Sequence, residues 1–181
     1  KETYDYFLWI IIPITLSAVI GSYIGKNVQM TSMPQMVSIF NGLGGLSAVF
    51  LSFIELYKIS VLVGEISFAY QITLIFSLFI GSIAFTGSML AFAKLDGYKW
   101  SEKLTLPFQH IINIILLLFT ILLSYFYFSN SSDFNYILAI LVISLVYGVF
   151  FVAPIGGADM PVVISLLNSF TGITAALTGI I

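Results

Sequence analysis

The sequence predicts an all-α fold, a polytopic membrane helix bundle with about six transmembrane helices. Of the 181 residues, 60% are hydrophobic and only 8% are charged, whereas an ordinary soluble domain is about 25% charged. Apolar blocks of about 20 residues, long enough for a helix to cross a bilayer core of about 30 Å, recur between short polar breaks. These blocks do not alternate in polarity as the strands of a membrane barrel do, as the run Ile111-Ile-Asn-Ile-Ile-Leu illustrates.

Six spans are expected, at about residues 6–24, 37–56, 68–92, 111–128, 136–152 and 160–181. The first does not resemble a secretory signal peptide, because acidic residues precede it and no small-residue cleavage site closes it. The chain begins without Met and its last span runs to the final residue, so we expect a fragment of a longer protein. No cysteine is present, which excludes thiol chemistry and disulfides.

Lysine placement predicts the orientation of the spans. With six spans, the loops after the first, third and fifth lie on one side of the membrane, and they hold Lys26, Lys94, Lys99 and Lys103. The other side holds Lys1 and Lys58. Because lysines in short loops favour the cytoplasmic side, the turn before the last span is expected on the cytoplasmic or matrix face.

The spans differ in the size of their side chains. Residues 111–128 and 136–152 are bulky and are expected to form lipid-facing walls. Three of the other four, residues 37–56, 68–92 and 160–181, each carry a stripe of small residues at helical spacing, which allows close approach of helices in lipid. Such stripes often serve packing alone, and the three helices that carry them are expected to form the packed interior. The stripes are Ser38, Asn41, Gly45, Ala48 and Ser52; Ser77, Gly81, Ala84, Ser88 and Ala91; and Ser165, Ser169, Gly172, Ala176 and Gly179.

Polar side chains accompany these stripes. Asn41, Ser88 and Asn168 lie one in each helix, with Thr86 and Thr171 nearby. An amide in hydrocarbon needs hydrogen-bond partners, since burying it without them costs on the order of a few kcal/mol. The pattern therefore predicts a polar thread through the interior, which could order water and pass protons. Hydroxyls are weaker evidence, because they can bond to their own helix.

A relay near neutral pH also needs a titratable group, and few are available. Glu55 and Glu65 lie near the ends of spans, where they are expected to be solvated at the interface. His110, the sole histidine, is expected at the membrane surface rather than in a relay. Asp159 is the remaining candidate, at the mouth of the last span.

Asp159 lies in the turn Pro154-Ile-Gly-Gly-Ala-Asp-Met-Pro161. Gly156 and Gly157 would permit a tight turn, and Pro161 suits the first turn of a helix. Asp159 is placed where an N-cap belongs, and a carboxylate there would accept free N–H groups. Helix capping and a functional role are both open for this residue.

Several segments together resemble the membrane domain of the β subunit of proton-translocating NAD(P) transhydrogenase, in the family's order and over nearly the whole chain. The most specific is the last, which begins with the turn just described and runs to Gly172. The others are Met30-Thr-Ser-Met-Pro-Gln-Met-Val37, Phe40-Asn-Gly-Leu-Gly-Gly-Leu-Ser-Ala-Val49, Phe85-Thr-Gly-Ser88 and Ala91-Phe-Ala-Lys-Leu95.

The resemblance implies that this chain couples proton movement to hydride transfer between NAD(H) and NADP(H), which are held in soluble domains outside it. It implies an α subunit, an NADP(H)-binding domain in the same subunit, the lipid bilayer and a dimer of the full complex as partners. It also implies a bacterial inner membrane, or alternatively a mitochondrial one. The chain itself has no nucleotide-binding G-x-G-x-x-G after a strand, so it is expected to bind neither NAD nor NADP and to transfer no hydride alone. It also shows no metal, nucleophile or nucleic-acid pattern.

Carried over from the family, the proton path falls on Asn41, Ser88 and Asn168, and the turn toward the NADP(H)-binding domain falls on Gly156, Gly157 and Asp159. Some members have histidine at the position of Asn41. An amide cannot take up a proton near neutral pH, so the relay here would use water or a titratable group of a partner helix, or be impaired; we favour the partner helix. A secondary transporter or channel, or a structural membrane anchor, are the alternative functions.

Overall fold

The structure, a computed structural model, describes residues 2–61, 67–105, 107–129 and 133–180, with side chains described from Phe7 onward. The described residues are mostly helical and contain no strand, and six helices are long and apolar enough to cross a membrane, which confirms the predicted fold class. The elements are α1 (Glu2–Asn27), η1 (Met30–Ser32), α2 (Met33–Val61), α3 (Phe68–Leu95), α4 (Lys99–Glu102), α5 (Gln109–Ser129), α6 (Phe134–Val152), η2 (Gly157–Asp159) and α7 (Met160–Gly179).

The chain forms two compact units, Lys1–Met33 and Pro34–Ile181. The first unit is built on α1, which continues through Pro13. None of the most apolar part of α1 is buried within the structure. A helix with apolar side chains on all sides suits direct contact with lipid.

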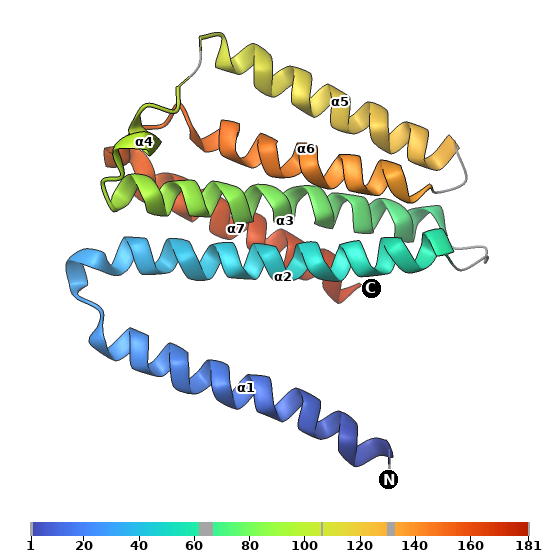
Figure 1. Cartoon of the computed structure of the whole chain (residues 1–181), viewed down its shortest axis with the longest axis horizontal. Helices are drawn as coiled ribbons and strands as arrows, with labels where there is room; N and C mark the ends of the chain where they lie inside the picture. Colours follow the sequence, from blue (N-terminus) through green and yellow to red (C-terminus); the bar gives the residue numbers. More distant parts are fainter. Residues whose placement is uncertain (1, 62–66, 106, 130–132, 181) are drawn as a thin grey trace. The chain divides into compact units, whose positions relative to one another are not determined.

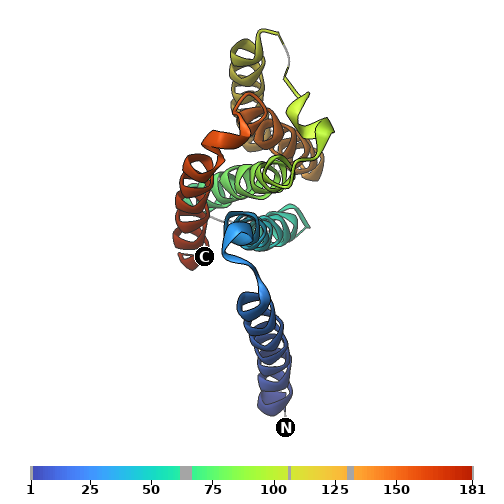
Figure 2. The ribbon, with the colours of Figure 1, turned by 90° about the vertical axis from the view of Figure 1, so that its left-hand side faces the viewer.

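The second unit is organised around α3, which packs against both α6 and α7, while α5 packs against α6 (Figure 1). Of the most apolar part of α3, 67% is buried, more than in any other candidate span of the described chain. Figure 2 shows α3 at the centre of this unit, with α2, α6 and α7 around it. Residues on α3 therefore contact three different helices.

The α2–α3 seam is made by two of the predicted small-residue stripes, and every member of both is buried. The helices come closest at Gly45 and Gly81. A Cβ at Gly45 would lie 2.8 Å from both the Gly81 carbonyl oxygen and the Phe85 nitrogen. Glycine is needed here because the two backbones are in direct contact.

The expectation for residues 136–152 was wrong in part, because α6 is not simply a lipid-facing wall. One face of α6 is buried against α3, and a Cβ at its Gly148 would collide with Thr86 Oγ1 and lie 2.8 Å from Ile83 Cα. This glycine lets α6 approach α3 as closely as α2 does. The bulky neighbours of Gly148 hid this contact in the sequence, whereas α5 does expose most of its surface as expected.

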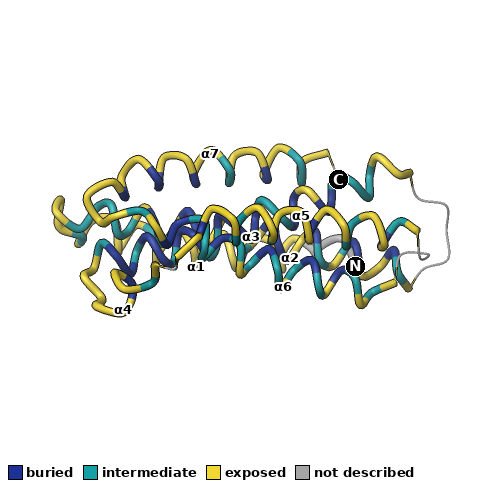
Figure 3. The backbone as a smooth tube through the Cα atoms, turned by 90° about the horizontal axis from the view of Figure 1, so that it is seen from above, coloured by how far each residue is buried: buried dark blue, intermediate teal, exposed yellow. Residues whose placement is uncertain are grey.

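The expectation for the α7 stripe was also wrong within the described chain. Ser165, Ser169, Gly172, Ala176 and Gly179 are all exposed, and a Cβ at Gly172 or Gly179 would meet open space. Instead α7 packs through its opposite face (Figure 3), formed by Met160, Val163, Ile164, Leu167 and Thr174. The larger apolar side chains fill the space beside α3, and the small residues face outward.

Candidate functional site

The centre of the candidate site is a hydrogen bond between α2 and α3. Asn41 Nδ2 donates to Ser88 Oγ at 2.8 Å, and Ser38 Oγ donates to the Ser88 carbonyl oxygen at 2.7 Å. All three residues are buried, and each lies within a candidate membrane span. The stripes position them, because residues three or four apart on α2 share the face that meets α3.

The Asn41 amide is only half satisfied. The residue is 6% exposed, and its Oδ1 atom has no hydrogen-bond partner among the described residues. A buried amide oxygen without a donor costs about 1–3 kcal/mol. A donor for this oxygen would come from outside the described residues, such as a water molecule or a side chain of another helix.

The seam is closed on one side of this pair. Gly45 and Gly81 bring the backbones together about one to two helical turns away, leaving no room even for a methyl group. Beyond this contact, the buried hydroxyls of Ser52 and Ser77 have no partner among the described residues. A polar route along the α2–α3 seam is thus interrupted by a dry, close-packed stretch.

The structure does not bring Asn168 to this pair. Asn168 is exposed on α7, although the polar thread predicted from the sequence placed it inside. The contact from α7 is instead made by Thr171, whose hydroxyl donates to the Asn41 carbonyl oxygen at 3.5 Å and to the Leu167 carbonyl oxygen at 3.2 Å. Asn168 precedes Thr171 by three residues, about one helical turn, but it is exposed and makes no contact with the pair among the described residues.

The turn before α7 differs from the predicted cap. Asp159 occupies the N-cap position, but its side chain makes no capping hydrogen bond, and its φ of −92° and ψ of 0° are not those of an N-cap residue. The η2 turn leads directly into α7, and Pro161 offers no N–H at one position that a cap would bind. Asp133 shows the contrast, since its ψ is 130° and it accepts a bond from the Asn135 nitrogen at the start of α6.

Asp159, Gly156 and Gly157 are exposed. Neither glycine has a positive φ. Contrary to our expectation, the backbone conformation of the turn therefore does not require glycine. A Cβ would fit at both positions, with the nearest atom 3.8 Å away at Gly157. The glycines therefore leave the backbone of the turn accessible, beside the Asp159 carboxylate, which makes no capping hydrogen bond.

Lys94 is the residue that the sequence analysis missed, because we counted it as a loop lysine. It lies in the last turn of α3 and is 7% exposed. Its Nζ donates to the carbonyl oxygens of Ala153 at 2.5 Å and Ile155 at 2.6 Å, with Val152 at 3.4 Å. Its position three residues after Ala91, on the small-residue stripe of α3, could have indicated its burial.

The other titratable groups lie apart from the Asn41–Ser88 pair. Glu55 forms an ion pair of 2.5 Å with Lys58, and His110 is exposed. Glu65 lies outside the described residues. Among the described residues, no cluster of three His, Cys, Asp or Glu side chains could hold a metal ion.

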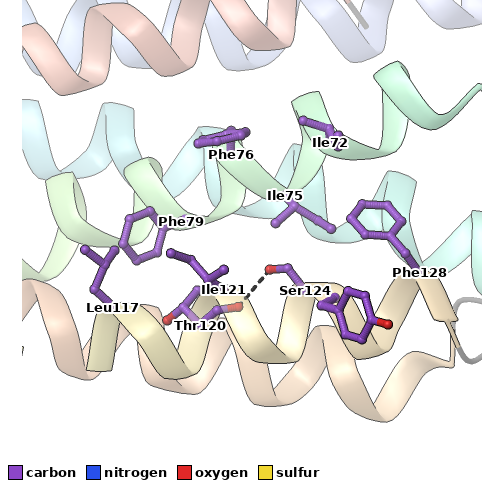
Figure 4. Close-up of a pocket in the computed structure, with 10 residues that line it drawn as sticks. Ile72, Ile75, Phe76, Phe79, Leu117, Thr120, Ile121, Ser124 and Phe128 are labelled. Atoms are coloured by element: carbon purple, nitrogen blue, oxygen red, sulfur yellow. Dashed lines mark hydrogen bonds between the residues drawn. The ribbon is translucent and has the colours of Figure 1, made fainter. Parts of the chain in front are cut away.

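A separate cavity of about 410 Å³ lies between α3 and α5. Its lining is apolar apart from a few hydroxyls, as Figure 4 shows for side chains such as Phe76, Phe79 and Ile121. Thr120 and Ser124 bond within α5, to the carbonyl oxygens of Leu116 and Thr120. With no carboxylate, lysine or histidine in its lining, this cavity does not extend the candidate site.

A family model described as NAD(P) transhydrogenase beta subunit matches residues 1–181. The chain belongs to the NAD(P) transhydrogenase beta subunit family. The NAD(P) transhydrogenase subunit beta of Rhodospirillum rubrum is 36% identical to it over 178 residues, which is 96% of this chain and 38% of that relative. A protein of the same name from a strain of that species matches equally.

The chain thus spans 38% of the length of the curated relatives that it matches. Its six candidate spans make this part of the transhydrogenase beta subunit family a multi-pass membrane segment. The family membership also agrees with the resemblance inferred from the turn before α7 and the Asn41 segment.

Proposed function

We propose that this chain is the proton-conducting membrane part of an NAD(P) transhydrogenase, which couples proton translocation to hydride transfer between NAD(H) and NADP(H). The observation that supports the proposal most is the buried Asn41–Ser88 pair, with Asn41 Oδ1 left without a donor in a membrane-spanning helix. Polar groups in membrane spans are costly and mark ion and proton pathways.

The pair itself positions a proton carrier and does not store a proton. Neither an amide nor a hydroxyl changes charge near neutral pH. Asn41 Oδ1 accepts a hydrogen bond from a water molecule or from a titratable side chain of a partner helix, and Ser88 fixes the amide in that orientation. We favour a helix of the α subunit, because charge switching requires a titratable group.

In this proposal the proton path continues from the pair toward α7 rather than along the α2–α3 seam. The Gly45–Gly81 contact blocks movement between α2 and α3. The outward face of α7, with Asn168 among small residues, offers the polar group and the close approach that a further helix needs. Asn168 would then join the proton path through that helix, as the family resemblance implies.

The turn formed by Gly156, Gly157 and Asp159 faces the NADP(H)-binding domain in this proposal. Its exposed backbone and carboxylate suit contact with a soluble domain. NAD and NADP are bound by the soluble domains of the complex and not by this chain. The complex is a dimer that includes the α subunit, in a bacterial inner membrane or a mitochondrial one.

The test uses the full-length β subunit assembled with its α subunit in sealed vesicles. Asn41→Leu and Asn168→Leu are each compared with Asn113→Leu, which removes an amide of α5 that bonds the Phe150 carbonyl oxygen at 3.4 Å, away from the pair. Proton uptake and hydride transfer are measured together. Asn41→Leu should lose at least about 80% of proton-coupled transfer, since removing an interacting partner in a buried polar site costs about 1–3 kcal/mol. Asn168→Leu should lose a similar share, because it removes the polar group that this proposal places against a further helix.

Normal proton uptake per hydride in both test variants would contradict the proposal. Equal losses in all three variants would also contradict it, because the effect would then follow from removing any membrane amide.

A further inference from the structure

Lys94 connects the end of α3 to the turn that precedes α7. Its ammonium group donates to carbonyl oxygens of Ala153 and Ile155, which lie between the last residue of α6 and Gly156. Its own carbonyl oxygen lies 3.8 Å from the position that a Cβ of Gly157 would take. Both the backbone and the side chain of Lys94 therefore pack against the turn.

This lysine bonds to backbone carbonyl oxygens and forms no salt bridge among the described residues, although the carboxylate of Glu102 is near enough to attract its charge. The carbonyls at the end of α6 carry the negative end of the helix dipole, which a cation stabilises. A buried charge is costly unless hydrogen bonds satisfy it, so the Lys94 ammonium and the carbonyls of Val152, Ala153 and Ile155 hold one another in place. Movement of the turn must move Lys94 or break these bonds.

The same helix holds the centre of the candidate site. Lys94 follows Ser88 by six residues, which is about 9 Å along the helix axis. Gln35 Nε2 also donates to the Leu95 carbonyl oxygen at 3.4 Å, one turn before Ser38 on α2. The end of α3 is thus linked to Ser88 along its own helix and to α2 through Gln35.

We propose that Lys94 is a positioning residue that transmits displacement of the Gly156–Asp159 turn to the Asn41–Ser88 hydrogen bond through α3. This inference rests on the proposed function and adds the residue that links its two parts. A state of the soluble domain that shifts the turn changes the position of Ala153 and Ile155 and, through Lys94, the end of α3. A sub-ångström shift there would weaken a hydrogen bond of 2.8 Å at Ser88.

The test compares Lys94→Met, Lys94→Arg and Lys99→Met in the full α and β complex in sealed vesicles. Met keeps the length and removes the cation, Arg keeps the cation, and Lys99 is an exposed lysine five residues away. The readout is protons taken up per hydride transferred, a ratio that does not depend on the amount of assembled complex. Lys94→Met should lower it about threefold or more, Lys94→Arg should recover at least half, and Lys99→Met should leave it unchanged.

A second measurement on the unsubstituted complex covers the case in which Lys94→Met does not assemble. Saturating NADP(H) should change the acylation rate of the Lys94 amine relative to that of Lys99 by about threefold or more. An unchanged ratio of rates, or normal protons per hydride in Lys94→Met, would overturn the role of Lys94. If Asn41→Leu is impaired in the same vesicles, the proposed function survives; if Asn41→Leu is also normal, the proposed function fails.

Discussion

Substitution of Gly45 by alanine tests the close α2–α3 contact that surrounds the candidate site. The added Cβ would lie 2.8 Å from the Gly81 carbonyl oxygen and the Phe85 nitrogen and 2.9 Å from Ala84 Cβ. The first two are backbone atoms of α3, so the strain cannot be relieved by rotating a side chain. The helices must separate, by several tenths of an ångström at least.

The expected magnitude follows from two opposing effects. Overpacking costs about 1–3 kcal/mol, whereas replacing a helical glycine by alanine gains about 1 kcal/mol of helix propensity. Gly45→Ala should therefore destabilise the protein by up to about 2 kcal/mol. Gly21→Ala is the matched control, because a Cβ at that helical glycine meets nothing within 4 Å.

Stability would be measured as thermal unfolding of the detergent-solubilised complex. Gly45→Ala should lower the midpoint and Gly21→Ala should leave it unchanged or raise it. A Gly45→Ala variant as stable as Gly21→Ala would contradict a direct backbone contact between α2 and α3 at this point.

Three further substitutions test other parts of the structure. Leu167→Ala should destabilise the complex by about 2 kcal/mol or more by opening a cavity beside Gly87, whereas exposed Leu166→Ala should cost less than about 0.5 kcal/mol in the same thermal assay. Asp159→Asn should change the free energy of unfolding by less than about 0.5 kcal/mol, because the carboxylate makes no capping hydrogen bond, and it should lower the number of protons taken up per hydride. A clear loss of stability would instead indicate that Asp159 caps α7. Gly148→Ala should lower the midpoint as Gly45→Ala does, through the α3–α6 contact, and an unchanged midpoint would contradict that packing.

The helices and the α2–α3 seam could be predicted from the sequence because both depend on local patterns. Apolar length determines the spans, and small residues at intervals of three and four determine one face of a helix. Asn41 and Ser88 were predicted in the interior for this reason and are buried, whereas the hydrogen bond between them could not be read from the sequence. Their function in proton transfer stays a prediction.

The placement of α6, α7 and Lys94 could not be predicted in the same way. A small-residue stripe shows which face permits close approach but not which helix meets it, so Gly148 was overlooked and Gly172 was placed inside. The burial of Lys94 depends on carbonyl oxygens about 60 residues away in sequence. Such long-range contacts leave no periodic pattern along the chain.

The most direct test of the central claim compares Ser88→Ala with Ser82→Ala in sealed vesicles that contain the full complex. Both serines are buried on α3, but within the described chain the Ser82 hydroxyl bonds to the Leu78 carbonyl oxygen of its own helix, whereas Ser88 Oγ accepts from Asn41. Ser88→Ala should lower proton-coupled hydride transfer about tenfold, because it leaves the Asn41 amide without its partner. Ser82→Ala should retain the unsubstituted rate, and equal rates in the two variants would contradict a proton path through the Asn41–Ser88 pair.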